Sequence, residues 1–192
     1  MTRKNIILDL DQTLIYSSSF NNFVIKDKDD KVKKEKKNKN IKRLKNFDYI
    51  NMEKLYKTIS RPGLQNFLDF LFKNFDVSIW TAASKDYALF IIDNIILSKE
   101  DRKLKYVFFS YHRDISEERT GNTKDLSLLY NNIPHTFNKN NTIIIDDYDE
   151  VKKTNKDNCI NIEPFIFKRN NSENDKELKY IEDSLIKWKN RK

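Results

Sequence analysis

The amino-acid sequence predicts an α/β fold in which helices cover both faces of a doubly wound, mainly parallel sheet. Short apolar runs alternate along the chain with segments whose apolar residues recur every three or four positions. The first run, residues 4–10, is nearly continuous, which is typical of a strand buried on both faces. At 192 residues, 38% of them hydrophobic, the chain can bury one core. We therefore expect a single domain over residues 1–192, without a large cap domain.

The first half of the chain is expected to begin with a strand at residues 4–10. Residues 16–60, which are polar and rich in lysine, predict an insertion resembling a ragged β-hairpin with a solvated lysine-rich tip. A helix is expected next, with Ser60 as its N-cap and Pro62 in its first turn. Its apolar face comprises Leu64, Phe67, Leu68, Leu71 and Phe75.

The second half continues the alternation of strands and helices. Residues 76–81 predict a strand and residues 84–97 an amphipathic helix. Further strands are expected at residues 105–110 and 141–147, and a short one at the edge of the sheet at residues 159–162. The chain is expected to end in a helix whose apolar stripe comprises Leu178, Ile181, Leu185 and Trp188.

Scarce residue types exclude several kinds of site. With only Gly63 and Gly121 as glycines, the chain has neither a P-loop nor the glycine cluster of a dinucleotide-binding fold. The one cysteine, Cys159, cannot form an intrachain disulfide and predicts a reducing compartment. Together with the two histidines it supplies too few ligands for a closed structural zinc site. A cysteine-based phosphatase would need arginine where the chain has Phe165.

The positive charge of the chain is concentrated in one segment. The net charge is +8, and Lys26–Lys45 holds eleven basic and four acidic residues, a net +7. A solvated loop is the simplest interpretation of this segment. The alternatives are a nucleic-acid or nuclear-localisation patch and a surface that steers an acidic phosphopeptide. No stretch is apolar enough to span a membrane and the N-terminus is charged, so we expect an intracellular protein of the nucleus or cytoplasm.

Polar residues that can carry chemistry stand at or just after the ends of four predicted strands. In chain order they are Asp9 and Asp11, Thr81, Lys124, and the pair Asp146 and Asp147. In open α/β sheets, ligands bind in the crevice beyond the carboxyl ends of the strands. Each residue also has a purely structural interpretation: a cap or calcium loop, a strand-end hydroxyl, a surface lysine or a helix cap.

Together these residue types supply what phosphoryl transfer through a carboxylate requires. One carboxylate attacks phosphorus and becomes an aspartyl-phosphate, while a second gives a proton to the leaving oxygen and later takes one from water. Neighbouring carboxylates repel each other and lose hydration, so a positive charge is expected between them. Mg²⁺, which prefers oxygen ligands, can supply that charge, and a hydroxyl and an ammonium can bind the phosphate oxygens.

Four motifs carry a resemblance to a known family. "DLDQT", "TAAS", "KDLS" and "IIDDYDE", in this order, resemble the motifs of the haloacid-dehalogenase (HAD) superfamily of phosphatases. The longer stretch "RPGLQNFLDFLFKNFDVSIWTAASKDYA" is similar to the NLI-interacting-factor-like group, which includes the phosphatases of the RNA polymerase II C-terminal domain (CTD). The likeness covers about residues 4–165, is weakest at residues 16–55, and implies a HAD-like Rossmannoid core.

The resemblance implies a role for each candidate residue. Asp9 would be the nucleophile and Asp11 the acid/base, while Thr81 and Lys124 would bind phosphate. The Mg²⁺ site would comprise Asp9, Asp11 through its backbone carbonyl, Asp147 and, through water or hydrogen bonds, Asp146.

The sequence also departs from the pattern of the group. Gln12 stands where the group usually has glutamate, and one extra small residue near "TAAS" leaves open which backbone N–H faces the phosphate. In the CTD phosphatases the insertion builds an apolar pocket for a substrate proline, to which Phe20, Phe23, Val24 and Ile25 could contribute here. His112 and Arg113 are either substrate contacts or part of a solvated loop.

The function that the resemblance implies is Mg²⁺-dependent hydrolysis of a phosphomonoester through an aspartyl-phosphate. An uncapped crevice cannot enclose a small metabolite but admits a residue of a protein or the end of a polymer. We therefore expect a phosphoprotein Ser/Thr phosphatase of the CTD phosphatase type. The alternatives are a nucleic-acid end phosphatase anchored by Lys26–Lys45 and a non-catalytic phosphopeptide- or nucleic-acid-binding module on the same fold.

Overall fold

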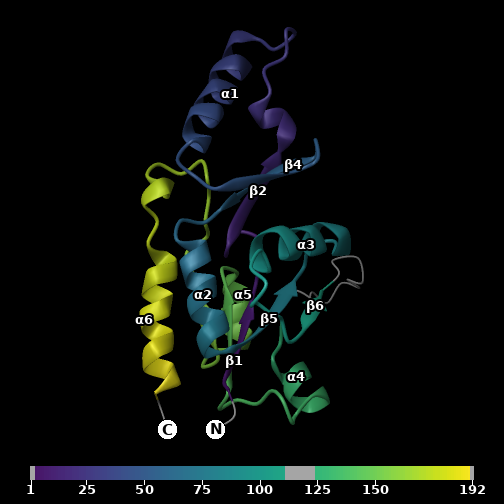
Figure 1. Cartoon of the computed structure of the whole chain (residues 1–192), viewed down its shortest axis with the longest axis vertical. Helices are drawn as coiled ribbons and strands as arrows, with labels where there is room; N and C mark the ends of the chain where they lie inside the picture. Colours follow the sequence, from purple (N-terminus) through teal and green to yellow (C-terminus); the bar gives the residue numbers. More distant parts are fainter. Residues whose placement is uncertain (1–2, 111–123, 191–192) are drawn as a thin grey trace.

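A parallel sheet with helices on both faces forms the centre of the structure, a computed structural model that describes residues 3–110 and 124–190 (Figure 1). The sheet has five strands in the order β6-β5-β1-β7-β8, and every pairing in it is parallel. Its strands are β1 (Asn5–Leu8), β5 (Asp76–Thr81), β6 (Val107–Phe109), β7 (Thr142–Asp146) and β8 (Cys159–Asn161). The predicted fold class is confirmed, and β8 is the expected short edge strand.

Strand β1 lies in the middle of this sheet, which explains its unbroken apolar sequence. Ile6 and Leu8 pack into the larger core cluster on one face, whereas Ile7 packs into a smaller cluster on the other. Successive side chains of a strand point to opposite faces, so a strand covered on both sides needs apolar residues at every position.

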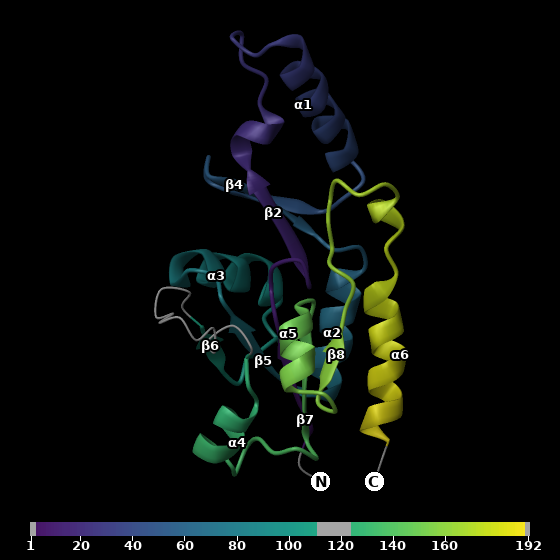
Figure 2. The same ribbon diagram turned by 180° about the vertical axis from the view of Figure 1, so that it is seen from behind.

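Helices on both sides complete the two core clusters. The helices that pack on the first face are α2 (Leu64–Asn74), α3 (Lys85–Ile91), which continues into a π-helical turn (Ile92–Ile96), and α6 (Glu177–Lys189). Helices α4 (Ser127–Asn132) and α5 (Asp149–Thr154) lie on the opposite face (Figure 2). Within the described ranges, no helix combines the length and the apolar character needed to cross a membrane.

Helix α2 begins later than the sequence predicts. Ser60 is the last residue of strand β4 and pairs with Ile15, so it is not the N-cap, and Pro62 precedes the helix. The N-cap is Gly63, whose φ of +78° lies in the left-handed region that glycine adopts most easily. Serine occurs in strands and turns as well as in caps, and proline is common in turns; here Ser60 pairs in a second sheet and Pro62 lies in the turn before the helix.

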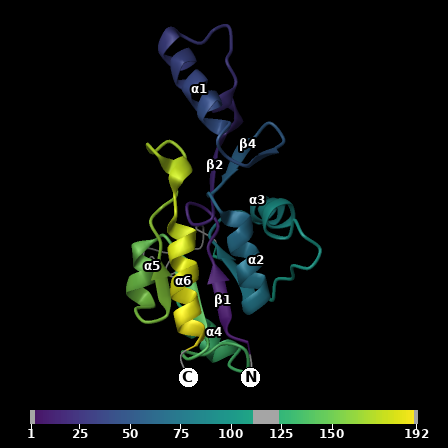
Figure 3. The ribbon, with the colours of Figure 1, turned by 60° about the vertical axis from the view of Figure 1, so that its left-hand side comes forward.

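That second sheet comes from the insertion, which is more ordered than a ragged hairpin. The antiparallel strands β2 (Ile15–Ser19), β4 (Tyr56–Ser60) and β3 (Tyr49–Met52) lie side by side in this order. A 3₁₀ turn (Phe20–Phe23) follows β2, and helix α1 (Lys31–Leu44) projects away from the main sheet (Figure 3). The insertion therefore stands above the carboxyl end of β1.

The expectation of a loop is wrong for residues 31–44, which form a helix, although the lysine-rich tip is largely exposed to solvent as expected. The Asp30 side chain caps α1 by accepting a 2.8 Å hydrogen bond from the Lys33 N–H. Lysine, arginine and glutamate are good helix formers, a preference that counting charges does not register. In α1 only Leu44, which lies in the last turn, is buried. There Leu44 joins a third cluster with Phe23, Ile59, Phe165 and Phe167. Because Phe23 packs in this core, its ring is not accessible to a substrate proline.

The buried guanidinium of Arg61 fastens the two sheets together. It donates hydrogen bonds to the carbonyls of Thr13 (3.0 Å) and Glu163 (2.8 Å). It also forms a two-pronged ion pair with Asp175, at 3.0 and 2.9 Å. The Arg61 side chain is 0% exposed, so its removal would leave the two carbonyls without this donor and Asp175, which also accepts from the Glu177 N–H, without its cation.

We expect the Arg61→Met variant to be strongly destabilised, because it leaves two carbonyls without this donor and the Asp175 carboxylate without its cationic partner. Breaking a buried pair of this kind costs about 3–5 kcal/mol, measured as the free energy of unfolding in urea. The Lys99→Met variant is the control: its 2.6 Å pair with Asp69 is about half exposed and should be worth less than about 1 kcal/mol. Equal losses in the two variants would contradict the anchoring role of Arg61.

Candidate active site

The carboxyl ends of β1, β5 and β7 open into a cleft of about 420 Å³. The cleft lies where ligands bind in open α/β sheets. All the residues singled out from the sequence line it: Asp9, Asp11, Thr81, Lys124, Asp146 and Asp147. Its remaining walls include Gln12, the two alanines that follow Thr81, Tyr148 and Val151.

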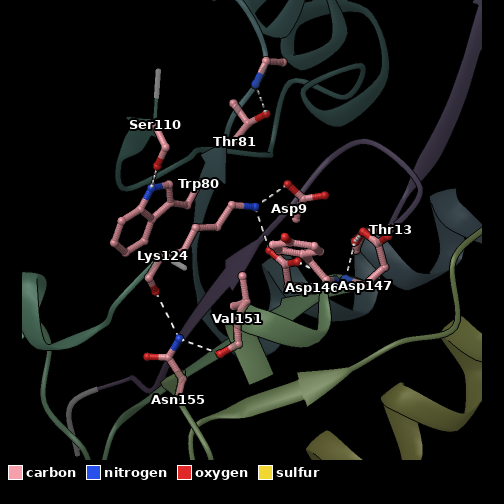
Figure 4. A network of polar contacts seen from close by, with 12 residues as sticks. Asp9, Thr13, Trp80, Thr81, Ser110, Lys124, Asp146, Asp147, Val151 and Asn155 are labelled. Atoms are coloured by element: carbon pink, nitrogen blue, oxygen red, sulfur yellow. Dashed lines mark hydrogen bonds and ion pairs between the residues drawn. The ribbon is translucent and has the colours of Figure 1, made fainter. Parts of the chain in front are cut away.

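The ammonium of Lys124 lies between two buried carboxylates (Figure 4). Its Nζ is 2.5 Å from Oδ1 of Asp9 and 2.6 Å from Oδ2 of Asp146. Burial disfavours the charged ammonium, but the two carboxylates outweigh that effect and raise the pKa of Lys124. The positive charge that the sequence led us to expect between carboxylates is thus, in this structure, a lysine.

Asp146 is the most deeply buried carboxylate of the cleft, with 1% of its surface exposed. Burial raises its pKa to about 7, repulsion from Asp9 adds to the rise, and the Lys124 ammonium opposes it. Its second oxygen accepts a 2.9 Å hydrogen bond from the Tyr148 N–H. Both oxygens of Asp146 therefore have donors from the protein.

Asp11 is held by a tyrosine from helix α3. The Tyr87 hydroxyl donates a 2.6 Å hydrogen bond to Oδ1 of Asp11, and Ser17 of β2 lies 2.5 Å from the same hydroxyl. Burial is the largest effect on Asp11; with repulsion from Asp9 and Asp147 it raises the pKa to about 6, against the hydrogen bond from Tyr87. The side chain therefore keeps a proton nearer to neutral pH than an exposed aspartate does.

Asp147 is positioned by Thr13, two residues after Asp11. The fully buried Thr13 hydroxyl donates to Oδ1 of Asp147 at 3.0 Å and accepts from the Asp147 N–H at 3.2 Å. Burial and repulsion from Asp9 raise the pKa of Asp147. Thus, three carboxylates that repel one another, those of Asp9, Asp11 and Asp147, share one side of the cleft.

These residues suit a hard divalent cation. Among the residues that line the cleft, four carboxylates face one ammonium, and carboxylate oxygens are the ligands that Mg²⁺ prefers. Over residues 3–110 and 124–190, no three aspartate, glutamate, histidine or cysteine side chains are grouped so that they could hold a metal ion by themselves. A metal here would therefore rest on one or two carboxylates, a backbone carbonyl and water, which is how Mg²⁺ usually binds in proteins.

Two residues that line the cleft have strained backbones. The φ angle is +61° at Gln12 and +43° at Lys124, in the left-handed region that residues with a Cβ rarely adopt. Asn155 stabilises the second conformation: its amide donates to the Lys124 carbonyl at 3.1 Å and accepts from the Leu126 N–H at 2.9 Å. Non-glycine residues in this region cluster at functional sites.

Sequence reasoning missed four residues that support the cleft: Thr13, Arg61, Tyr87 and Asn155. The first three lie inside the motifs quoted for the family resemblance but were given no role there. Asn155 lies in a polar stretch with no distinguishing pattern. All four act through contacts between segments far apart in the chain, which spacing along the sequence does not reveal.

The structure also shows the surroundings of Thr81 and Cys159, two other residues discussed from the sequence. The Thr81 hydroxyl accepts a 3.1 Å hydrogen bond from the Ala83 N–H, so this N–H already has a partner. Cys159 is buried in the smaller core cluster, and burial raises the pKa of its thiol to about 12, consistent with packing rather than nucleophilic chemistry. His112 and Arg113 lie outside the described residues.

The fold and the cleft define a HAD-like hydrolase: a parallel α/β sheet with aspartates after the central strand and acidic residues after its neighbour. The sequence model of the NLI interacting factor-like phosphatases matches residues 4–192, and the chain belongs to this family. It is accordingly a phosphatase, a phosphoric monoester hydrolase. The family expected from the sequence motifs is confirmed.

Relatives agree with this assignment, and a solved structure agrees with the fold. The chain is 42% identical over 187 residues to the CTD phosphatase-like protein 355R of Invertebrate iridescent virus 6, covering 95% of this chain and 97% of the relative. The corresponding protein of Invertebrate iridescent virus 3 is 36% identical, with 97% of both chains covered. The structure of the fission yeast RNA polymerase II CTD phosphatase Fcp1 bound to beryllium fluoride shares the fold, with a TM-score of 0.56 and 19% identity over 96% of this chain and 50% of that one.

We expect Mg²⁺ to stabilise the protein more at about pH 7.5 than at about pH 5. With pKa values of about 6 for Asp11 and about 7 for Asp146, the folded protein binds more protons than the unfolded chain from about pH 4 to pH 7, so stability falls as pH rises. A cation bound to ionised carboxylates opposes that loss. Thermal unfolding with Mg²⁺ or a chelator at each pH measures the difference.

The Asp147→Asn variant should lose the Mg²⁺-dependent rise in melting temperature, because it removes one of the three mutually repelling carboxylates, those of Asp9, Asp11 and Asp147, whose charge a bound cation would compensate. The Thr81→Val variant, which alters the cleft without touching a carboxylate, should keep it. A rise of the same size in wild type and Asp147→Asn would place the metal elsewhere.

Proposed function

We propose that this chain is a Mg²⁺-dependent phosphatase that removes phosphate from phosphoserine or phosphothreonine of a protein substrate, with Asp9 as the nucleophile. The observation that carries the proposal is the placement of Asp9 beside the Lys124 ammonium, 2.5 Å away, in a cleft that Thr81 also lines. A carboxylate, an ammonium and a hydroxyl in one cleft are what attack on phosphorus and binding of its oxygens require.

In the first half of the reaction, an Asp9 oxygen bonds to phosphorus as the bond to the serine or threonine oxygen breaks. Asp11 gives its proton to that leaving oxygen, and its raised pKa keeps the proton available. Lys124 and the Thr81 hydroxyl bind the oxygens of the phosphoryl group and offset their charge. A bound Mg²⁺, held by Asp9, the Asp11 carbonyl and Asp147, would neutralise the charge that keeps an anionic nucleophile from an anionic phosphate.

In the second half, water attacks the phosphorus of the aspartyl-phosphate. Asp11, now ionised, takes the proton from that water, and the bond between phosphorus and Asp9 breaks. Inorganic phosphate leaves, with Asp9 again a carboxylate and Asp11 again protonated, so the cycle closes. The Tyr87 hydroxyl, 2.6 Å from Asp11, orients the side chain in both halves.

The proposal of a protein substrate has two supports. The cleft of about 420 Å³ lies near the insertion sheet, and among the described residues no separate domain covers it, so a side chain that projects from a polypeptide can reach Asp9. The viral relatives are named as CTD phosphatase-like and the yeast neighbour as an RNA polymerase II CTD phosphatase. A nucleic-acid end is the second candidate, favoured by the net +7 of α1, which has eight basic residues and one acidic residue.

We expect the Asp9→Asn variant to lose turnover of p-nitrophenyl phosphate by at least about 10³-fold, because an amide oxygen is a poor nucleophile. The variant should remain folded, because asparagine is isosteric with aspartate and Asp146 still pairs with Lys124. Thermal unfolding checks this. The Asp183→Asn variant, which makes the same chemical change at an ion pair exposed on both sides, should retain full activity. Mg²⁺-dependent turnover of Asp9→Asn near the wild-type rate would refute Asp9 as the nucleophile.

A further inference from the structure

A groove rich in lysine lies between the C-terminal half of α1 and the segment at residues 168–171. It consists of two adjoining hollows of about 350 and 370 Å³ that share Lys39 and Arg43. We call it the α1 groove. Its basic side chains are Lys36, Lys39, Lys42 and Arg43 on the helix and Lys168 opposite them.

Arg43 gives the α1 groove a fixed shape. Its guanidinium donates to the carbonyls of Lys168 and Arg169 and to the Glu173 carboxylate, and it lies over the ring of Phe167 at 5.9 Å. Only 13% of the Arg43 side chain is exposed. The floor of the groove is therefore tied to the third core cluster, while the lysines at its rim stay in solvent.

The lysines of the α1 groove lack acidic partners. Over the described residues, no ion pair involves Lys36, Lys39, Lys42 or Lys168, whereas Lys37 of the same helix pairs with Asp29 at 2.6 Å. Lysines three residues apart lie side by side on a helix and repel each other. A bound anion would relieve that repulsion, so the α1 groove is suited to a negatively charged ligand.

A further hollow adjoins the cleft and reaches Ile166, which lies near the α1 groove in the sequence. Its volume is about 510 Å³, and its lining includes Asp11 and Gln12, which also line the cleft, and Ile166, two residues before Lys168. Tyr16 and Ser17 of β2 form the wall between these ends. A polypeptide bound at Asp9 thus has a recessed surface to follow as far as Ile166, two residues before Lys168.

We propose that the α1 groove binds a second anionic group, a phosphoserine or a run of acidic residues, on the same protein substrate whose phosphate enters the cleft at Asp9. This inference rests on the proposed function. A peptide fits better than a nucleic acid because the groove is lined by lysine, arginine, asparagine and glutamate, without aromatic rings on which bases could stack. The Glu173 carboxylate in its wall also disfavours a continuous phosphate backbone.

The test measures binding by fluorescence anisotropy in the Asp9→Asn background, where the peptide is not consumed. The probes are a peptide with one phosphoserine, a series in which a second phosphoserine moves one residue at a time from the first, and a single-stranded oligonucleotide. The groove variant is Lys36→Gln/Lys39→Gln/Lys42→Gln, since glutamine retains helix propensity. The matched control is Lys73→Gln/Lys103→Gln/Lys187→Gln, which removes the same charge from exposed lysines elsewhere in the chain.

We expect the second phosphoserine to tighten binding about tenfold at a preferred spacing, and the groove variant alone to lose that gain. Affinity for the singly phosphorylated peptide should be unchanged in both variants. The gain should also shrink at about 0.5 M salt, where exposed charges are screened. Circular dichroism confirms that α1 is still helical in the groove variant.

Three results would overturn the inference. The first is no gain from a second phosphoserine at any spacing, and the second is an equal loss of that gain in the groove and control variants. The third is a groove variant that binds the oligonucleotide more weakly but binds every peptide as the parent protein does. The last would assign the α1 groove to nucleic acid. Binding is measured without turnover, so the two proposals can fail separately. If the groove variant loses the spacing-dependent gain in affinity but the wild-type protein has no phosphatase activity, the inference about the α1 groove stands and the proposed function is refuted. If the wild-type protein has phosphatase activity but the groove variant keeps the gain in affinity, only the inference about the α1 groove is refuted.

Discussion

The contact of one ammonium with two buried carboxylates is the constraint on which the candidate site depends. Asp9 and Asp146 end up next to each other because β1 and β7 are paired in parallel register, and burial alone would make that arrangement unfavourable. Lys124, which follows β6 and the segment after it, supplies the compensating charge. Removing one partner of such a buried set typically costs about 3–5 kcal/mol, so the fold and the candidate chemistry are stabilised by the same contact.

The insertion contributes to the site as well as covering it. Arg61, just after β4, binds the Thr13 carbonyl, and the Thr13 hydroxyl in turn holds Asp147. On the other side, Ser17 of β2 contacts the Tyr87 hydroxyl that donates to Asp11. Two of the carboxylates in the cleft are therefore oriented through residues of the second sheet or adjoining it. This dependence gives the insertion a structural role near the chemistry that is separate from any role of α1.

The sequence predicts the main sheet well and the insertion poorly, for physical reasons. Residues 4–10 and 141–147 are apolar runs that end in aspartates, a pattern that only a central parallel strand leading to a polar site explains simply. In α1, the repulsion between positive charges disfavours a helix, whereas the helix propensity of the residues favours one. The cap at Asp30 and the tertiary contacts of Leu44 stabilise the helix. The contacts of Tyr87 and Asn155 join segments 76 and 31 residues apart, beyond what local patterns show.

The central claim is that Asp9 is the group that bonds to phosphorus. A crystal structure of the protein with beryllofluoride and Mg²⁺ tests it most directly, because beryllofluoride imitates a phosphoryl group on a carboxylate. The account predicts beryllium bonded to an Asp9 oxygen, its fluorides within hydrogen-bond distance of Lys124 Nζ and the Thr81 hydroxyl. Beryllium on Asp11, Asp146 or Asp147, or a cleft that takes up metal without beryllofluoride, would contradict it.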